Sequence, residues 1–415
     1  MPTHRPPLSR RLPWDQACNA LAAEVADRKE QGLTTIDLTE SNPTRVGLVY
    51  PEAELADILR RHASPDYPPH PLGLPEAREA LAAALSRPGD QVARDDLVLT
   101  ASTSEAYSYL FKLFGDPGDE VLTAAPAYPL LDELARLDAL VLRHFRLEPG
   151  RRFALGPGEL ERALTPRTKL LALVHPANPT GSFLSRAEQD AVVELCTARG
   201  LPWICDEVFA DYPLEGKAGE GARARQNSRA GAAAAREETL AFSLGGLSKS
   251  AGLPGWKLGW IRVGGPAAER RRIVAALERV ADAYLSVSTP VQRALGDVLA
   301  LAPAIRAAIL ERLSRNLAAL EGAFAGLPAV EIYRPEGGWS AVLRVPRLTT
   351  DEDLVLGALR QAGILVHPGY FFDFETDGFL VLSLLPEPDK FSGGVRRLAE
   401  HLGELMRGDV RSGAP

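Results

Sequence analysis

The stretch Ser248-Lys249-Ser250-Ala251-Gly252-Leu253-Pro254-Gly255-Trp256-Lys257 surrounds a lysine with small residues and places a Gly/Pro turn and a second lysine after it. Small neighbours leave the Lys249 amine open to a planar cofactor, and burial lowers the pKa of a lysine until its neutral amine can form a Schiff base. Arginine supplies most of the other positive charge of the chain, which favours a chemical role for this lysine. The alternative is a surface lysine whose aliphatic stem covers apolar neighbours.

The composition is that of a soluble globular protein. The chain has 415 residues, 46% hydrophobic and 24% charged, with a net charge of -7. An acidic chain without a clustered basic face is not expected to bind nucleic acid. Its apolar runs are too short to cross a membrane, and Cys18, Cys196 and Cys205 lack the spacing of a disulfide framework or a metal site. We therefore expect a cytoplasmic protein that holds no metal.

Apolar runs alternate with amphipathic segments through the middle of the chain. The predicted strands are residues 97–100, 120–123, 169–174, 202–205, 239–243 and 258–263. Helical periodicity separates several of them, as at residues 188–199. This alternation favours an α/β fold, with helices on both faces of a parallel sheet and ligands at the carboxyl ends of its strands.

The C-terminal part has a different pattern. Helices predicted at 267–283 and 303–327 precede strands at 329–333, 340–345 and 379–384, with a helix at 351–362. We expect an N-terminal arm and part of a small domain at 1–45, a large α/β domain at 46–295, a small α+β domain at 296–408 and a tail at 409–415. The Gly-, Ala- and Arg-rich segment 215–238 is expected to be a surface insertion.

Three polar segments follow predicted strands. Ala101-Ser102-Thr103-Ser104 opens a helix, where its hydroxyl and N–H groups would bind an anion or simply cap the helix. The strand predicted at 169–174 is followed by His175-Pro176-Ala177-Asn178-Pro179-Thr180-Gly181, and the strand at 202–205 by Asp206-Glu207-Val208-Phe209. All three segments are expected at the edge of the sheet where ligands bind.

Together with the lysine stretch, the order and spacing of these segments resemble the fold-type I pyridoxal-phosphate enzymes, in particular the class I and II aminotransferases, over nearly the whole chain. The resemblance implies a mainly parallel seven-stranded sheet between helices, a smaller α+β domain, and ping-pong transfer of an amino group from an amino donor to a 2-oxo acid. The alternative is a β-eliminating C–S lyase or another fold-type I reaction. A non-catalytic regulator is disfavoured, because the segment before Asp37 is too short for a DNA-binding domain.

The resemblance also implies roles for individual residues. Lys249 would attach the cofactor and move the Cα proton of the substrate. Asp206 would pair with the pyridine nitrogen and keep the ring protonated, so that it can accept electrons. Asn178 would donate a hydrogen bond to the phenolic oxygen, and Tyr128 would stack on the ring.

The phosphate of the cofactor would be bound by a second group of residues. Thr103 and Ser104 match the family's phosphate turn, and Ser248 and Lys257 match further donors. Tyr67 resembles the tyrosine that reaches the phosphate of the neighbouring subunit, which implies a homodimer with shared active sites.

Two departures from the family pattern concern the cofactor. Lys257 stands where relatives usually have arginine, so the cation binds phosphate as a point charge and lacks a bidentate fork. Phe209 stands where a tyrosine normally donates to the phenolic oxygen, which leaves the phenolate less stabilised.

A third departure concerns the substrate. Val381 occupies the position of the arginine that binds the substrate α-carboxylate, and a valine cannot bind an anion. Either another cation takes the carboxylate, with Arg45, Arg344 and His70 as candidates, or the substrate is not an ordinary α-amino acid. The turn containing Ser41 and Asn42 is a candidate substrate loop or a connector, and Asn178 is a further substrate-binding candidate. No arginine occurs in residues 284–290, where aspartate-specific relatives carry one, so strict aspartate specificity is not expected.

Overall fold

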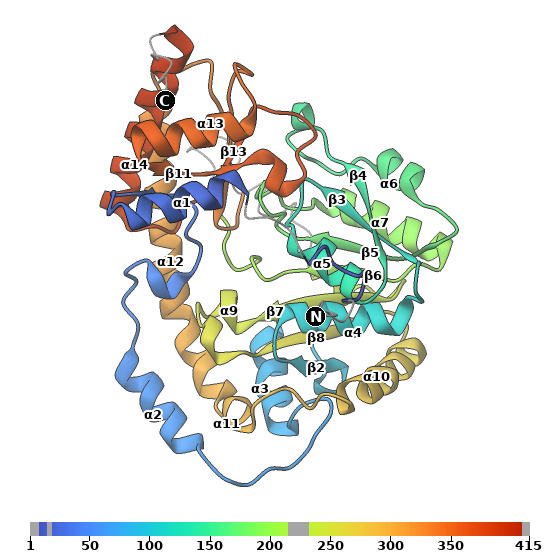
Figure 1. Cartoon of the computed structure of the whole chain (residues 1–415). Helices are drawn as coiled ribbons and strands as arrows, with labels where there is room; N and C mark the ends of the chain where they lie inside the picture. Colours follow the sequence, from blue (N-terminus) through green and yellow to red (C-terminus); the bar gives the residue numbers. More distant parts are fainter. Residues whose placement is uncertain (1–7, 15–18, 215–231, 409–415) are drawn as a thin grey trace, which may run out of the picture.

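A seven-stranded sheet forms the centre of the larger part of the molecule in the computed structural model, which describes residues 8–14, 19–214 and 232–408 (Figure 1). Its strand order is β2-β8-β7-β6-β5-β3-β4. Only β8 runs against its neighbours in this sheet, and the other pairs are parallel. The strands are β2 (Leu97–Thr100), β3 (Glu120–Ala125), β4 (Val141–Arg146), β5 (Thr168–Val174), β6 (Trp203–Asp206), β7 (Ala241–Gly246) and β8 (Gly259–Gly264). The predicted α/β fold is thereby confirmed.

Both faces of this sheet are buried, which explains the continuous apolar strands. In β5, Leu170 packs in the cluster on one face and its neighbour Leu171 in the cluster on the other. The first cluster includes α4 (Thr103–Phe114), α5 (Leu130–Leu137) and α10 (Ala267–Asp282), and the second includes α6 (Pro157–Ala163) and α7 (Arg186–Arg199). β4 was not predicted, because it is an edge strand with polar, partly exposed residues.

A four-stranded antiparallel sheet forms the smaller part. Its order is β12-β13-β10-β9, with β9 (Glu331–Tyr333), β10 (Ser340–Arg344), β12 (His367–Pro368) and β13 (Phe379–Ser383). Beside it, β1 (Ile36–Asp37) pairs with β11 (Ile364–Leu365). This pairing supports the assignment of the first residues to the small domain, which stays a prediction. The surrounding helices are α1 (Ala20–Glu30), α13 (Asp351–Gly357) and α14 (Pro388–Arg407).

The long helix α12 (Leu295–Phe324) joins the two parts and packs along α14 (Figure 1). The prediction that this helix begins at Pro303 was wrong. Leu295, Val298 and Ala302 extend its buried stripe against α3 (Pro75–Leu85), and this packing outweighs the cost of a proline inside a helix. Near its start lie α2 (Glu52–His62), α9 (Leu247–Ser250) and α11 (Thr289–Arg293).

Two predictions fall on residues outside the described ranges. Most of the predicted insertion, residues 215–231, and the predicted tail, residues 409–415, are among them. Residues 233–235 of the insertion are described and form a short 3-10 helix, whose Ala233 and Ala234 are buried against the large sheet.

Candidate active site

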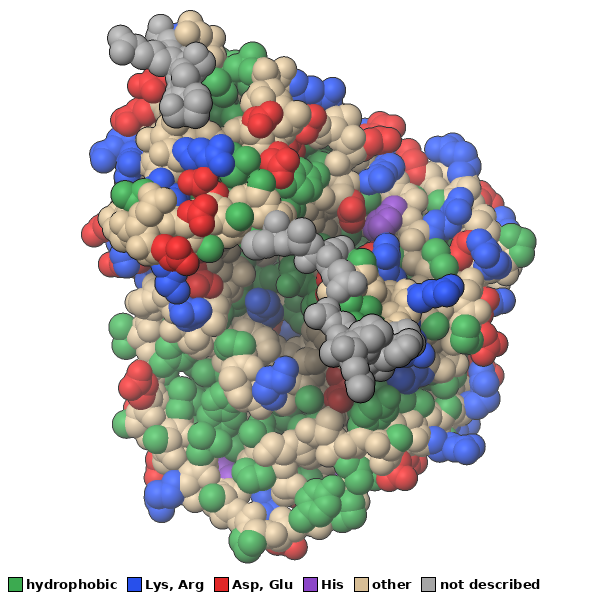
Figure 2. Space-filling model, viewed as in Figure 1, with side chains coloured by type: hydrophobic (Ala, Val, Ile, Leu, Met, Phe, Trp, Pro, Cys, Tyr) green, Lys and Arg blue, Asp and Glu red, His purple; other side chains and the backbone are tan. Residues whose placement is uncertain are grey.

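A cavity of about 290 Å³ lies where the carboxyl ends of the parallel strands face the four-stranded sheet. Figure 2 shows the surface hollowed between the part that contains α1, α13 and α14 and the part built on the large sheet. Residues from both parts line the cavity, including Asp206 at the end of β6 and Val381 on β13. The site is therefore at the edge of the sheet where ligands of open α/β sheets bind.

The turn that follows β7 carries Lys249 into this cavity on the short helix α9. Its Nζ lies 4.5 Å from the ring centroid of Trp339 and 5.4 Å from that of Phe209. Burial lowers the pKa of the Lys249 amine to about 8, although the Asp206 carboxylate partly opposes the shift. The hydroxyl of Tyr212, a residue that the sequence did not single out, donates to the Lys249 carbonyl and holds the turn in place.

Asp206 ends β6 and is buried in the floor of the cavity. Burial raises the pKa of its carboxyl group to about 6, against the stabilising N–H of Val208 at 3.1 Å, the Tyr107 hydroxyl and the charge of Lys249. Tyr107 was not among the residues predicted for the site. It lies one helical turn after Thr103 on α4, a spacing that places both on one face and would have indicated its position.

The next carboxylate, Glu207, points to a different environment. It accepts hydrogen bonds from the Ala233 N–H at 2.7 Å and from the Ser243 hydroxyl at 2.9 Å, and it does not line the cavity. Burial raises the pKa of Glu207 to about 7. The two neighbouring acids therefore have separate roles: Asp206 faces the cavity, and Glu207 anchors the short helix at residues 233–235.

The N-terminus of α4 forms a third wall. Thr103 and Ser104 line the cavity, while Ser102 accepts a hydrogen bond from the Glu105 N–H at 3.2 Å and caps the helix. Ser102 is thus the cap of this helix, and Thr103 and Ser104 remain the candidates for an anion site. Ser248 and Lys257 do not line the cavity, and the Lys257 side chain is exposed.

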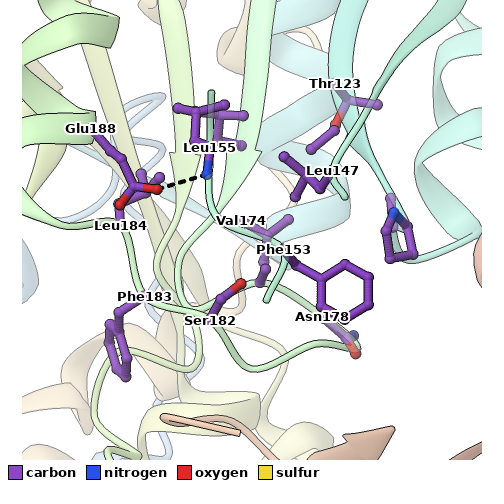
Figure 3. Close-up of a pocket in the computed structure, with 15 residues that line it drawn as sticks. Thr123, Leu147, Phe153, Leu155, Val174, Asn178, Ser182, Phe183, Leu184 and Glu188 are labelled. Carbon is purple, nitrogen blue, oxygen red and sulfur yellow. Dashed lines mark hydrogen bonds between the residues drawn. The ribbon is translucent and has the colours of Figure 1, made fainter. Parts of the chain in front are cut away.

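Asn178 and Tyr128 line the cavity from the loops after β5 and β3. The Asn178 loop turns at Gly181, whose φ of +71° favours glycine and whose Cβ position would collide with Pro335 and Gly337. Asn178 also borders a smaller cavity of about 40 Å³, where Figure 3 shows Phe153 and Ser182 and the hydrogen bond from the Leu155 N–H to Glu188.

One wall of the cavity is mainly apolar and combines Phe209, from the turn after β6, with side chains of the small part. Phe209 and Trp339 pack edge to face at 5.3 Å, and Phe372 and Val381 continue the apolar surface. Val381 is 1% exposed and packs in a cluster of aromatic side chains. None of the described residues that line the cavity is an arginine.

Several residues predicted at the substrate end lie elsewhere. Ser41 lines the cavity, but Asn42 accepts a hydrogen bond from the Thr44 N–H at 3.1 Å and does not. Arg344 is exposed, hydrogen-bonds to Tyr333 and lies outside the cavity. The other two candidate cations, Arg45 and His70, are exposed outside it as well.

Tyr67 does not line the cavity of its own chain. Its side chain is 59% exposed and borders a separate small pocket with His70 and Ser286. Ser286 donates a hydrogen bond at 2.6 Å to Glu105, in the first turn of α4, so this pocket lies close to the helix end that faces the active-site cavity.

A buried amine of lowered pKa, a buried carboxylate and a helix N-terminus at the carboxyl edge of a mainly parallel sheet define a fold-type I α/β enzyme. The family model for class I and II aminotransferases matches residues 40–389. The chain therefore belongs to the aminotransferase class I and II family, and it is an aminotransferase.

Named relatives cover nearly the whole chain. An aspartate/prephenate aminotransferase of Thermus thermophilus is 29% identical over 95% of this chain and 99% of its own length. A glutamate-pyruvate aminotransferase of Haemophilus influenzae is 24% identical over 92% of this chain and 94% of its own length. Among solved structures, an alanine aminotransferase of Pyrococcus furiosus superposes with a TM-score of 0.85 at 22% identity, covering 96% of this chain and all of its own.

Proposed function

We propose that this aminotransferase uses pyridoxal 5'-phosphate to move an amino group between an amino donor and a 2-oxo acid by a ping-pong mechanism. The observation that carries the proposal is the Lys249 amine of lowered pKa, in the same cavity as the Asp206 carboxylate. When bound, the cofactor supplies an aldehyde that condenses with amines and a pyridine ring that accepts electrons.

The side chains around the cavity fit this group. Lys249 offers the amine, Asp206 a carboxylate for the ring nitrogen, Asn178 an amide donor and Tyr128 an aromatic face. Thr103 and Ser104 offer hydroxyl and N–H groups at a helix N-terminus, which attracts a phosphate. We keep Lys257 and Ser248 as candidate phosphate ligands from the resemblance, although they do not line the cavity.

The protein's own groups have distinct tasks in the reaction. Because its pKa is about 8, roughly one-tenth of the Lys249 amine is neutral at pH 7, far more than for an ordinary lysine, and the neutral amine takes the Cα proton of the bound substrate. Asp206 holds a proton at the ring nitrogen, since the bound pyridinium favours the charged carboxylate. Trp339 and Phe209 shield the amine from water, which keeps its pKa low.

A half-reaction experiment tests the proposal. The cofactor-loaded protein is mixed with single amino donors, and the interconversion of pyridoxal and pyridoxamine forms is followed by absorbance, with pyruvate and 2-oxoglutarate as acceptors in separate assays. The proposal requires conversion by at least one donor and reversal by a 2-oxo acid. Release of ammonia without a 2-oxo acid would instead identify an eliminating lyase.

We also propose a homodimer in which Tyr67 serves the cavity of the partner. An interface is supported by the apolar surface around α2 and α11 in Figure 2. It is also supported by exposed large side chains, those of Val49, Tyr67 and Tyr284. Mixing inactive Lys249→Ala and impaired Tyr67→Phe chains tests sharing. If the sites are shared, a dimer of one chain of each variant has one site with both defects and one site with an intact Lys249 and an intact Tyr67. The mixture should then be more active than either variant alone.

We propose a cytoplasmic location, which the unpaired Cys196 and Cys205 support. Within the described ranges, no helix is both long and apolar enough to span a membrane. Fractionation of expressing cells, with the enzyme activity followed, tests the location.

A further inference from the structure

The cavity lacks the arginine that its family uses for the substrate carboxylate, and the three cations predicted to replace it lie outside. Of the described residues that line the cavity, only Lys249 and His367 can carry a positive charge. Lys249 is engaged in the amine chemistry proposed above. His367 is therefore the remaining basic side chain that a substrate can meet there.

His367 lies directly beside Val381, the position where the family pattern has arginine. On β12 it is the register partner of Val381 on β13, and the two strands are antiparallel. Register partners in an antiparallel pair point to the same face, with Cβ atoms about 4.5–5.5 Å apart. The imidazole therefore lies on the cavity side of the sheet, next to Val381, and both residues line the cavity.

The hydrogen-bonding capacity of this histidine is unused. Its Nδ1 is buried without a partner, and neither ring nitrogen takes part in a hydrogen bond within the described ranges. The ring packs against Phe371 and Phe372, with centroids 5.6 and 5.8 Å away. A buried N–H without an acceptor is less tolerable than a lone pair without a donor, so the proton is favoured on Nε2.

Burial favours the neutral form of the imidazole. Burial lowers the pKa of His367, and the exposed Asp37 on β1 opposes the shift. Trp339 also has an indole N–H without a partner, but its ring packs on Lys249 and Phe209, whereas His367 is the register partner of Val381. Beside Val381, the donor is thus the Nε2–H of a neutral imidazole.

We infer that His367 binds the carboxylate of the amino-acid substrate, in the place that Val381 leaves without a cation, and that the substrate is a monocarboxylic amino acid with an apolar side chain. The inference rests on the proposed transamination. Phe209, Phe372, Trp339 and Val381 give the substrate side chain an apolar surface, and no second cation is present on the described wall for a distal carboxylate.

L-leucine and isopentylamine, which differ only in the carboxylate, provide the test as amino donors. His367→Phe keeps the aromatic packing and removes the donor. We expect the KM for L-leucine to rise about 10- to 150-fold in this variant, because a hydrogen bond to a charged group is lost, while kcat changes little. The KM for isopentylamine should stay the same. His367→Gln, which keeps an N–H, should restore part of the affinity for L-leucine.

His144 supplies a control, because it is another partly buried histidine but does not line the cavity; its Nε2 has no hydrogen bond and lies 3.7 Å from the Asp373 carboxylate. His144→Phe should leave the preference for L-leucine over isopentylamine unchanged. An equal loss with both donors in His367→Phe would overturn the inference.

Binding gives a second, activity-independent readout. Calorimetry with isocaproate, the leucine analogue without the amino group, should show a Kd that rises in His367→Phe by a similar factor. An unchanged Kd would refute the carboxylate role. If the parent converts no donor at all, the proposed transamination fails, and the isocaproate result still decides the role of His367.

Discussion

The side of the cavity built by the parallel strands carries Asn178, Asp206 and Lys249, whereas the side built by the four-stranded sheet carries Phe372, Val381 and a single histidine. On the first side, burial shifts the pKa of Lys249 to about 8 and that of Asp206 to about 6. On the second side, an apolar wall replaces the cation expected from the family. In the proposed reaction, the first side would hold the charges that move protons, and the second would select the substrate.

Removal of the amine should give the largest effect on the polar side. Lys249→Ala is expected to lower kcat by about 10⁴-fold or more, because both the covalent attachment and the proton transfer are lost. Borohydride reduction followed by mass spectrometry should trap the cofactor on Lys249 in the parent and on no residue in the variant. Lys390→Ala, which removes an exposed lysine paired with Glu387, is the control and should retain the trapped adduct. A cofactor trapped on another lysine of the parent would contradict the assignment.

The two adjacent carboxylates offer the next comparison. Asp206→Asn keeps the shape but loses a charge-assisted hydrogen bond, so kcat/KM should fall about 10- to 150-fold. Glu207→Gln changes a carboxylate that faces Ala233 and Ser243, and its kcat/KM should remain close to that of the parent. Steady-state kinetics of both variants with one donor and acceptor pair measures this difference. Equal losses would mean that Asp206 acts only through the fold.

The pH dependence of stability should reveal Glu207. Its pKa rises from 4.5 in the unfolded chain to about 7, so the folded protein binds more protons in that interval and its free energy of unfolding falls as pH rises from 4.5 to 7. Asp206 contributes in the same direction between 3.8 and about 6, and Lys249 in the opposite direction between about 8 and 10.5. Urea unfolding of the cofactor-free protein across this range should give a shallower fall in Glu207→Gln. An identical slope would exclude a titrating Glu207.

Added polarity on the apolar wall should have the smallest effect. Phe209→Tyr places a hydroxyl in the cavity near Lys249, whose Nζ lies 5.4 Å from the present ring. A neutral hydrogen bond to the phenolic oxygen would lower the midpoint of the visible pH titration of the loaded protein by about 0.4–1 unit. Phe372→Tyr is a control on the same wall, and an equal shift there would show that the effect is not specific to position 209.

Local sequence patterns were sufficient for the polar side. Asp206 follows an apolar strand, and Lys249 lies in a turn of small residues, so strand–turn chemistry places each at the same edge of a parallel sheet. The same reasoning could not give the positions of the Lys257 and Arg344 side chains, because residue type indicates a possible ligand but not the direction in which its side chain points. Both are exposed outside the cavity.

The sequence by itself determined the α/β architecture, the family, the lysine and carboxylate of the site, and the absence of arginine at position 381. These features depend on periodicity and on residues close together in the chain. Only the tertiary structure decided that Tyr107 reaches Asp206, that Tyr212 fixes the Lys249 turn, and that His367 stands beside Val381. The physical reason is that these contacts arise from helix packing and antiparallel register, which join residues far apart in the sequence and are settled by the burial of the whole core.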